Sequence, residues 1–291
     1  MNCDWVWVDN QKKLESARSD IQNSPFTGVD TEYDSFRYFR EKLCLIQIVG
    51  GSKTYLFDPF EDLDISFLGT VFSDSETLKI IHAGDNDIRI LNRDYGFVFK
   101  NIFDTHRAAS ILGCNHLSLS NVVNNYLGVT LNKSKKMQRS QWETRPLTDE
   151  QLHYAVQDTS YLLELYRTLK DMLKINGLEE KAYEAFAIVE AARWSAKTLD
   201  PNGYMKIKGC QNLSEHQKKC LAALCRWRFE KARETNKARF MILSDQNLID
   251  LSREKIDTIT SLNETGVLSP RKIRNFGPEI IKTLDKDLLN F

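Results

Sequence analysis

The sequence predicts an α/β protein in which a sheet flanked by helices is followed by a smaller all-helical domain. Strand-like and helix-like segments alternate in the first half of the chain, and helical spacing dominates from Leu117 onward. A strong turn signal, DPNG at residues 200–203, separates the last stretch of short helices from the rest. The 291 residues suffice for one large domain or two of ordinary size.

The composition narrows the class of protein. Hydrophobic residues make up 42% of the chain and charged residues 27%, which is typical of a soluble globular protein rather than a disordered or fibrous one. The 40 basic and 40 acidic side chains balance, but residues 1–212 carry 25 and 29 of them whereas residues 213–291 carry 15 and 11. The whole chain does not resemble a nucleic-acid binder, while its C-terminal part leans that way.

The cellular compartment is indicated by what the sequence lacks. Six scattered cysteines form no CxxC pair, as expected of buried thiols in a reducing compartment: Cys3, Cys44, Cys114, Cys210, Cys220 and Cys225. The N-terminus has neither a basic start nor an apolar run, and no stretch of about 18 apolar residues occurs. We therefore expect no secretory signal, no membrane contact and a cytoplasmic protein.

The expected elements follow in chain order. Three strand-like runs, Phe26–Glu32, Lys42–Val49 and Thr54–Phe57, are closed by turn residues, and Leu78–His82 is a fourth run that leads into helical spacing. A later apolar stripe predicts one long helix and consists of Leu152, Val156, Thr159, Leu163, Tyr166 and Leu169. A further helix is expected over Glu179–Leu199. The predicted domains are residues 1–205 and 210–291.

The first candidate site is the run Val29-Asp30-Thr31-Glu32. Residues two apart on a strand share a face, so Asp30 and Glu32 point to one spot about 5–6 Å apart. Two such carboxylates repel unless a divalent cation neutralises them, and hard oxygen ligands suit Mg²⁺ or Mn²⁺. The alternative is a pair of acidic residues at the solvated end of a strand.

Two further acidic features have ordinary alternatives as well. Asp85 is placed to cap a helix and Asp87 would lie in its first turn, a structural role that explains Asp85 fully. Tyr154 and Asp158 are four residues apart on a helix, off the apolar stripe, so they face solvent or a cleft. Together, four carboxylates and a tyrosine are what two metal ions about 3.5–4 Å apart need for an in-line phosphoryl displacement.

The three features also occur in a familiar order: DTE, then HAGDND, then YAVQD. With LNKS at 131–134, QW at 141–142, RPL at 145–147 and DTSYLLELY from Asp158, the chain resembles the DEDDy exonuclease superfamily, specifically ribonuclease D. Residues 213–284 resemble the HRDC domain, a small helical nucleic-acid-binding module, through LSEHQKKCLAALCRWRFEKARE and GVLSPRKIRNFG.

The resemblance implies a fold and an activity. It implies an RNase H-like fold with a five-stranded mixed sheet, and a 3′→5′ exoribonuclease that releases mononucleotides, with tRNA 3′ maturation as the expected role. Asp30, Glu32, Asp87 and Asp158 would bind two divalent ions, Mg²⁺ or Mn²⁺, and Tyr154 would orient the attacking water. An ordinary tyrosine has a pKa of about 10, so the metal must supply most of the activation of that water.

The chain departs from ribonuclease D in two places. Many members carry an acidic residue or asparagine before the tryptophan found here as Trp142, whereas this chain has Gln141. The best-known bacterial members have two C-terminal HRDC-type domains, and this chain has room for one. The first difference concerns a local substrate contact and the second the length of RNA that is held.

Substrate contacts are expected from Thr31, Lys133, Trp142 and Arg145. Five basic residues against one acid between positions 133 and 145 could hold phosphates near the 3′ end, although Lys135 and Lys136 are better interpreted as a solvated loop. Trp142 either stacks on a base or packs against the turn at 145–147.

The second domain carries its own basic features. Residues 218–239 hold eight basic side chains against two acidic ones. They form either a surface that follows a nucleic-acid backbone or simply a charged helix face. Arg271, Lys272 and Arg274 lie near Gly277 and could hold a phosphate at a helix end. The expected partner is RNA with a single-stranded 3′ end, tRNA precursors above all. Only the resemblance favours RNA over DNA, and the presence of all five site residues argues against a silent scaffold.

Overall fold

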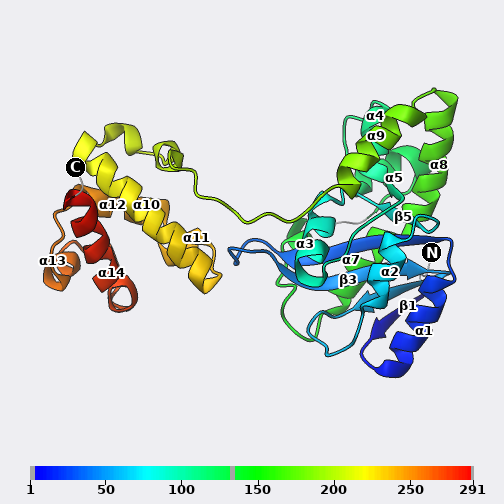
Figure 1. Cartoon of the computed structure of the whole chain (residues 1–291), viewed down its shortest axis with the longest axis horizontal. Helices are drawn as coiled ribbons and strands as arrows, with labels where there is room; N and C mark the ends of the chain where they lie inside the picture. Colours follow the sequence, from blue (N-terminus) through cyan, green and yellow to red (C-terminus); the bar gives the residue numbers. More distant parts are fainter. Residues whose placement is uncertain (1–3, 132–134, 290–291) are drawn as a thin grey trace. The chain divides into compact units, whose positions relative to one another are not determined.

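The computed structural model describes residues 4–131 and 135–289 and divides the chain into two compact units (Figure 1). The first unit runs to Asp34 and continues over Lys42–Ser195, and the second comprises Ser35–Glu41 and the chain from Ala196 onward. The division therefore falls ten residues before the expected end at 205, and it assigns a short segment of the first half to the second unit.

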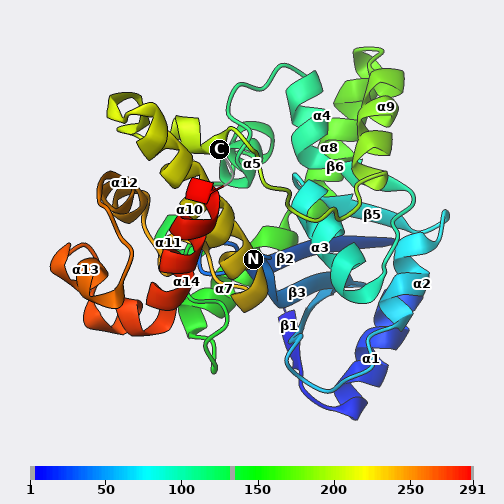
Figure 2. The ribbon, with the colours of Figure 1, turned by 60° about the vertical axis from the view of Figure 1, so that its left-hand side comes forward.

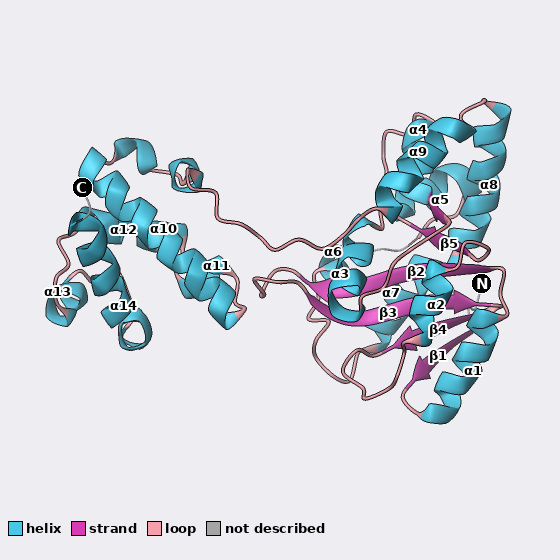
Figure 3. Ribbon diagram, viewed as in Figure 1, coloured by secondary structure: helices cyan, strands magenta, loops and turns pink. Residues whose placement is uncertain are grey.

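A six-stranded mixed sheet forms the centre of the first unit, in the order β1-β4-β3-β2-β5-β6 (Figure 3). Its strands are β1 (Asp4–Val8), β2 (Phe26–Asp34), β3 (Lys42–Gly50), β4 (Lys53–Phe57), β5 (Leu78–Ile81) and β6 (Ile102–Asp104). The pairs β2/β3 and β3/β4 are antiparallel, and the other three pairs are parallel. The mixed α/β class is confirmed, with one strand more than the five expected.

Helices cover both faces of this sheet. They are α1 (Gln11–Gln22), α2 (Phe67–Ser73), α3 (Asp85–Tyr95), α4 (Thr105–Ile111), α5 (Leu119–Leu127), α6 (Lys135–Gln138), α7 (Asp149–Ser160), α8 (Leu162–Ile175) and α9 (Glu179–Glu190). Along β3, Ile46 and Ile48 pack with α1, α2 and α3, whereas Leu45 packs with α7. Because successive strand residues point to opposite faces, β3 is buried on both sides.

Two helices end earlier than the sequence pattern predicts. The expected long helix over residues 152–169 is two helices, because α7 ends at Ser160 and α8 begins at Leu162. The break lets α7 pack on β2 and β3 while α8 packs on α4 and α5. The helix expected to reach Leu199 ends at Glu190, and the chain from there to the second unit is largely irregular.

The second unit is a small helical domain, as expected (Figure 2). It contains the short 3₁₀ turns η1 (Gly203–Lys206) and η2 (Cys210–Asn212), then α10 (Glu215–Thr235), α11 (Arg239–Ile242), α12 (Asp245–Arg253), α13 (Ile259–Glu264) and α14 (Pro270–Leu289). Helix α10 packs against α12 and α14 through Leu221, Leu224 and their apolar neighbours. None of the described helices is long and apolar enough to cross a membrane.

The segment Ser35–Glu41, here called the tip segment, joins β2 to β3 but belongs to the second unit. The ring of Phe39 is buried and meets that of Phe229 edge to face, with centroids 5.1 Å apart. The Ala238 N–H donates to the Arg37 carbonyl at 2.9 Å, and Tyr38 forms an isolated β-bridge with Lys237. The second unit is therefore built from two separate stretches of the chain.

Candidate metal centre

Three carboxylates from two elements gather on one side of the sheet. Asp30 and Glu32 lie on β2 and Asp158 lies on α7, and one oxygen of each is within 4.8 Å of the others. They meet because α7 packs against β2 and β3. Glu32 and Asp158 are buried and Asp30 is half-buried, so water screens their mutual repulsion poorly. A donor set of carboxylate oxygens fits Mg²⁺ or Mn²⁺.

A glutamine that the sequence analysis did not select lies directly beside this cluster. Gln47 on β3 is opposite Asp30 in the β2–β3 register, and its Nε2 is 3.5 Å from Asp30 Oδ2. The side chain is fully buried, and its Oε1 has no hydrogen-bond partner within the described part of the chain. A lone amide in the apolar run LCLIQIV was the available signal, but strand register was needed to place it.

Asp87 is held differently from the other three acids. Its carboxylate accepts a hydrogen bond from the Thr31 hydroxyl, and among the described residues it is not a member of the three-carboxylate group. Burial raises the pKa of Asp87 to about 6, with a smaller contribution from the charge of Asp104. Its assignment as the fourth ligand stays a prediction.

Asp85 does not cap its helix, contrary to expectation. Helix α3 begins at Asp85 itself after Gly84, and the Asp85 carboxylate is paired with Arg107 at 3.1 Å. An acid at the first helical position is still favourable, because it lies at the positive end of the helix dipole.

Asp104, a second residue that the sequence analysis missed, fixes the turn ahead of α3. Its oxygens accept from the backbone N–H groups of Ala83 at 3.2 Å and Gly84 at 3.0 Å. The same carboxylate caps α4 through the N–H groups of His106 and Arg107. Burial raises the pKa of Asp104, while these bonds favour its charged form. It therefore positions the start of the helix that carries Asp87.

Tyr154 is next to the carboxylate cluster. It is four residues before Asp158 on α7 and its ring centroid is 5.9 Å from that of Trp142. Burial raises the pKa of the Tyr154 phenol above its ordinary value, and the negative charges of Glu32 and Asp30 raise it further. The hydroxyl therefore keeps its proton at neutral pH.

Two expected substrate contacts are structural residues. Trp142 is only 1% exposed and packs among Cys44, Leu45 and the apolar face of α7, so no base can stack on its ring. Arg145 donates to both oxygens of the buried Asp58 and to the carbonyls of Cys44 and Trp142, each carbonyl at 2.7 Å. These bonds occupy the guanidinium and hold the 142–147 segment against β3 and β4. The packing alternative for Trp142 agrees with the structure.

The other two contacts are less informative. Thr31 is buried, with its hydroxyl on Asp87. Lys133 lies outside the described residues.

The basic run of the second unit is largely used in ion pairs. Arg228 is buried and paired with Asp245 at 2.7 Å, and Lys231 is 2.8 Å from both Glu234 and Glu279. Such pairs favour the charged-helix interpretation for much of α10. Arg271, Lys272 and Arg274 lie in the first turns of α14, so the helix end that they occupy is an N-terminus.

Comparisons with known proteins agree with this arrangement. A family model described as 3'-5' exonuclease matches residues 5–174, and an HRDC domain model matches residues 217–284. The chain is 31% identical over 266 residues to Ribonuclease D of Desulfotalea psychrophila, covering 90% of this chain and 70% of that protein. It is 29% identical to the Exosome complex component 10 homolog of Drosophila melanogaster over 97% of this chain, but spans only 32% of that protein's length.

A solved structure extends the likeness to the fold. The crystal structure of Escherichia coli RNase D, described as an exoribonuclease involved in structured RNA processing, superimposes with a TM-score of 0.76 at 27% identity, over 98% of this chain and 75% of that one. The chain is thus an α/β protein of the nuclease class with an appended helical module. It belongs to the 3′-5′ exonuclease family, among the proteins of ribonuclease D type that carry an HRDC domain.

Proposed function

We propose that the protein is a metal-dependent 3′→5′ exoribonuclease that removes mononucleotides from RNA 3′ ends. The observation that carries this proposal is the convergence of Asp30, Glu32 and Asp158 within 4.8 Å, in the domain matched by the exonuclease model. A divalent cation between carboxylates so close together would offset their mutual repulsion. Ribonuclease D relatives supply the preference for RNA over DNA.

In the proposed mechanism, Asp30, Glu32, Asp158 and Asp87 hold two divalent ions. When bound, such ions activate a water nucleophile and neutralise the charge that develops on the leaving 3′ oxygen. Asp87 would ionise readily in their presence, because a nearby cation lowers a carboxyl pKa that burial has raised. Gln47 holds the orientation of the Asp30 carboxylate from the neighbouring strand.

Tyr154 has a positioning role in this mechanism. In the metal-free protein, burial and the charges of Glu32 and Asp30 raise the pKa of its phenol, and the role that we propose for the protonated hydroxyl is to orient the attacking water by hydrogen bonding. The natural substrates that we propose are structured RNAs with single-stranded 3′ ends, tRNA precursors among them. Support comes from the ribonuclease D relatives and from the HRDC domain match.

A direct test offers the purified full chain 5′-labelled RNA and DNA of equal sequence with Mg²⁺ or Mn²⁺. We expect RNA to shorten one nucleotide at a time, to stop on addition of excess chelator, and to resume when the metal is restored. Undiminished cleavage in chelator would exclude the metal mechanism. Equal rates on RNA and DNA would contradict the RNA preference and leave a general exonuclease.

A further inference from the structure

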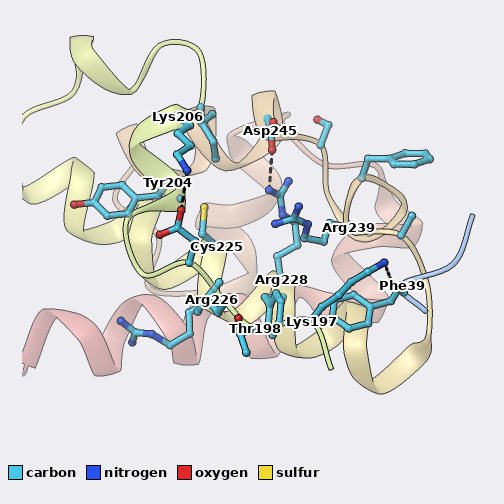
Figure 4. A pocket seen from close by; sticks show the side chains of 18 of the residues that line it. Phe39, Lys197, Thr198, Tyr204, Lys206, Cys225, Arg226, Arg228, Arg239 and Asp245 are labelled. Carbon is cyan, nitrogen blue, oxygen red and sulfur yellow. Dashed lines mark hydrogen bonds and ion pairs between the residues drawn. The ribbon is translucent and has the colours of Figure 1, made fainter. Parts of the chain in front are cut away.

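The second unit contains a pocket of about 1000 Å³ that the proposed reaction does not use (Figure 4). It is lined by the tip segment, the chain from Lys197 to Ile207, α10, and the first residues of α11 and α12. All of the lining residues belong to the second unit. The volume is at the upper end of the range of roughly 300–1,000 Å³ for small-ligand sites, so the pocket has room for an extended ligand.

Positive charge predominates in this pocket. Its basic lining residues are Lys197, Lys206, Arg226, Arg228 and Arg239, and its acidic ones are Asp200 and Asp245. Lys197 is paired with Glu41 of the tip segment at 3.0 Å, Lys206 with Asp200 at 2.9 Å and Arg228 with Asp245 at 2.7 Å. Arg226 on α10 and Arg239 at the start of α11 are exposed and extend the positive charge to the surface. An anionic ligand is therefore favoured.

Exposed aromatic rings lie at the same pocket. Phe36 is 68% exposed and Phe240 is 47% exposed, and their ring centroids are 4.9 Å apart. The two segments that carry these rings are held together, because Phe39 of the tip segment packs on Phe229 and the Ala238 N–H donates to the backbone of the tip segment. Two large, exposed apolar rings are thus held next to each other.

Basic and aromatic residues lie close together in both segments that form this feature. The tip segment reads Phe36-Arg37-Tyr38-Phe39-Arg40, and the segment bridged to it reads Lys237-Ala238-Arg239-Phe240. Interleaving of cations with stackable rings is the pattern by which proteins hold single-stranded nucleic acid, since bases stack on the rings and phosphates meet the cations. An acidic peptide would use the charges but leave the paired rings without a flat partner.

We propose that this pocket binds single-stranded RNA, with a base stacked against the Phe36–Phe240 pair and phosphates held by Arg239 and Arg226. The inference rests on the proposed function, because it adds a second contact for the RNA whose 3′ end is cleaved. The tip segment follows directly on β2, the strand that carries Asp30 and Glu32. RNA in the pocket would thus contact residues adjacent in sequence to the metal centre.

The test measures binding of the full chain, in chelator, to 5′-fluorescent oligouridylates of about 4 and about 16 nucleotides. Phe240→Ala should weaken binding of the longer oligonucleotide by between about 5-fold and 150-fold, the usual cost of losing one stacked base. Arg239→Glu should flatten the slope of log affinity against log salt by about 0.7 for each phosphate that the variant no longer neutralises.

Two matched controls separate this site from general effects. Met241→Ala removes a neighbouring side chain of similar exposure, 44%, that does not line the pocket. Lys255→Glu makes the same charge change as Arg239→Glu at an exposed position between α12 and α13. Both controls should bind like wild type. Thermal melting should be unchanged in all four variants, since each altered side chain is exposed.

The outcomes distinguish this inference from the proposed function. The inference is supported if wild type and Phe240→Ala cleave the short oligonucleotide at equal rates in the presence of metal. Phe240→Ala should at the same time bind only the longer oligonucleotide more weakly than wild type does. Failure of wild type to cleave either RNA contradicts the proposed function instead. Unchanged RNA affinity in both pocket variants overturns the inference. Binding of polyglutamate is measured with the same variants. If the two pocket variants lose polyglutamate binding but keep their RNA affinity, the inference is overturned in favour of an acidic protein partner.

Discussion

Asp30 is the residue on which the candidate metal centre depends most directly. It is half-buried between Glu32 and Asp158, and Gln47 approaches it from the adjacent strand. Without a cation, the three negative charges repel one another in a poorly hydrated place. We therefore expect Asp30 to lower the stability of the metal-free protein.

Asp30→Asn should lower turnover by at least about 100-fold, because loss of even an indirect support of a metal ligand can cost that much. The metal-free variant should be no less stable than wild type, since one of the repelling charges is gone. Asp171→Asn, an exposed acid on α8, is the control for the change of charge. Activity comes from stopped assays and stability from urea unfolding, and a large loss of stability would make Asp30 structural.

Tyr154→Phe removes one hydroxyl beside the carboxylates and preserves the packing of the ring on Trp142. We expect RNA and metal binding to persist while the single-turnover cleavage rate falls by about 100-fold, the order of the loss when a reacting group is misplaced by about 1 Å. Tyr183→Phe, on the exposed face of α9, should have no effect. An unchanged single-turnover rate in Tyr154→Phe would return the residue to a packing role.

At the scale of elements, α7 links the core to the site. A capping box between Thr148 and Gln151 begins it, and Ala155 and Val156 pack into the core. Its other residues then present Tyr154 and Asp158 to the strand that bears Asp30. One face of α7 thus stabilises the unit by burial, while the adjacent face carries the candidate site residues.

Asp104 makes a sharper prediction at this scale, because one carboxylate holds both the start of α4 and the turn before α3. Asp104→Ala should destabilise the protein by at least about 2 kcal/mol, more than loss of a single cap, since the N–H groups of two separate turns lose their acceptor. The control is Ser118→Ala, which removes one exposed cap of α5 and should cost about 1 kcal/mol. Equal losses in urea unfolding would mean that Asp104 acts as an ordinary cap.

How far the sequence predicts the structure depends on the range of the contacts involved. Local periodicity is enough to group Asp30 with Glu32 and Tyr154 with Asp158, and it identifies the central strands. Local sequence patterns could not predict the structural role of Arg145, because its partner Asp58 is 87 positions away in the sequence. The same limit hid Gln47, which required strand register. Strand β6, only three residues long, is too short to show alternation.

At the scale of the whole molecule, charge and chemistry are divided between the units. The first unit carries the acidic centre, and the second carries the basic aromatic pocket on a helical scaffold. From the RNA site that we propose in this pocket, we expect the second unit to contribute to the salt dependence of RNA binding.

The divided origin of the second unit also affects how the protein is made. Phe39 leaves the ribosome about 190 residues before its partner Phe229, which at about 5–20 residues per second is a wait of roughly 10 to 40 s. During that interval the nascent chain exposes three aromatic side chains at the end of its central hairpin, Phe36, Tyr38 and Phe39. The exonuclease domain can complete its sheet meanwhile, but the ring of Phe39 stays unprotected until α10 with Phe229 has been made.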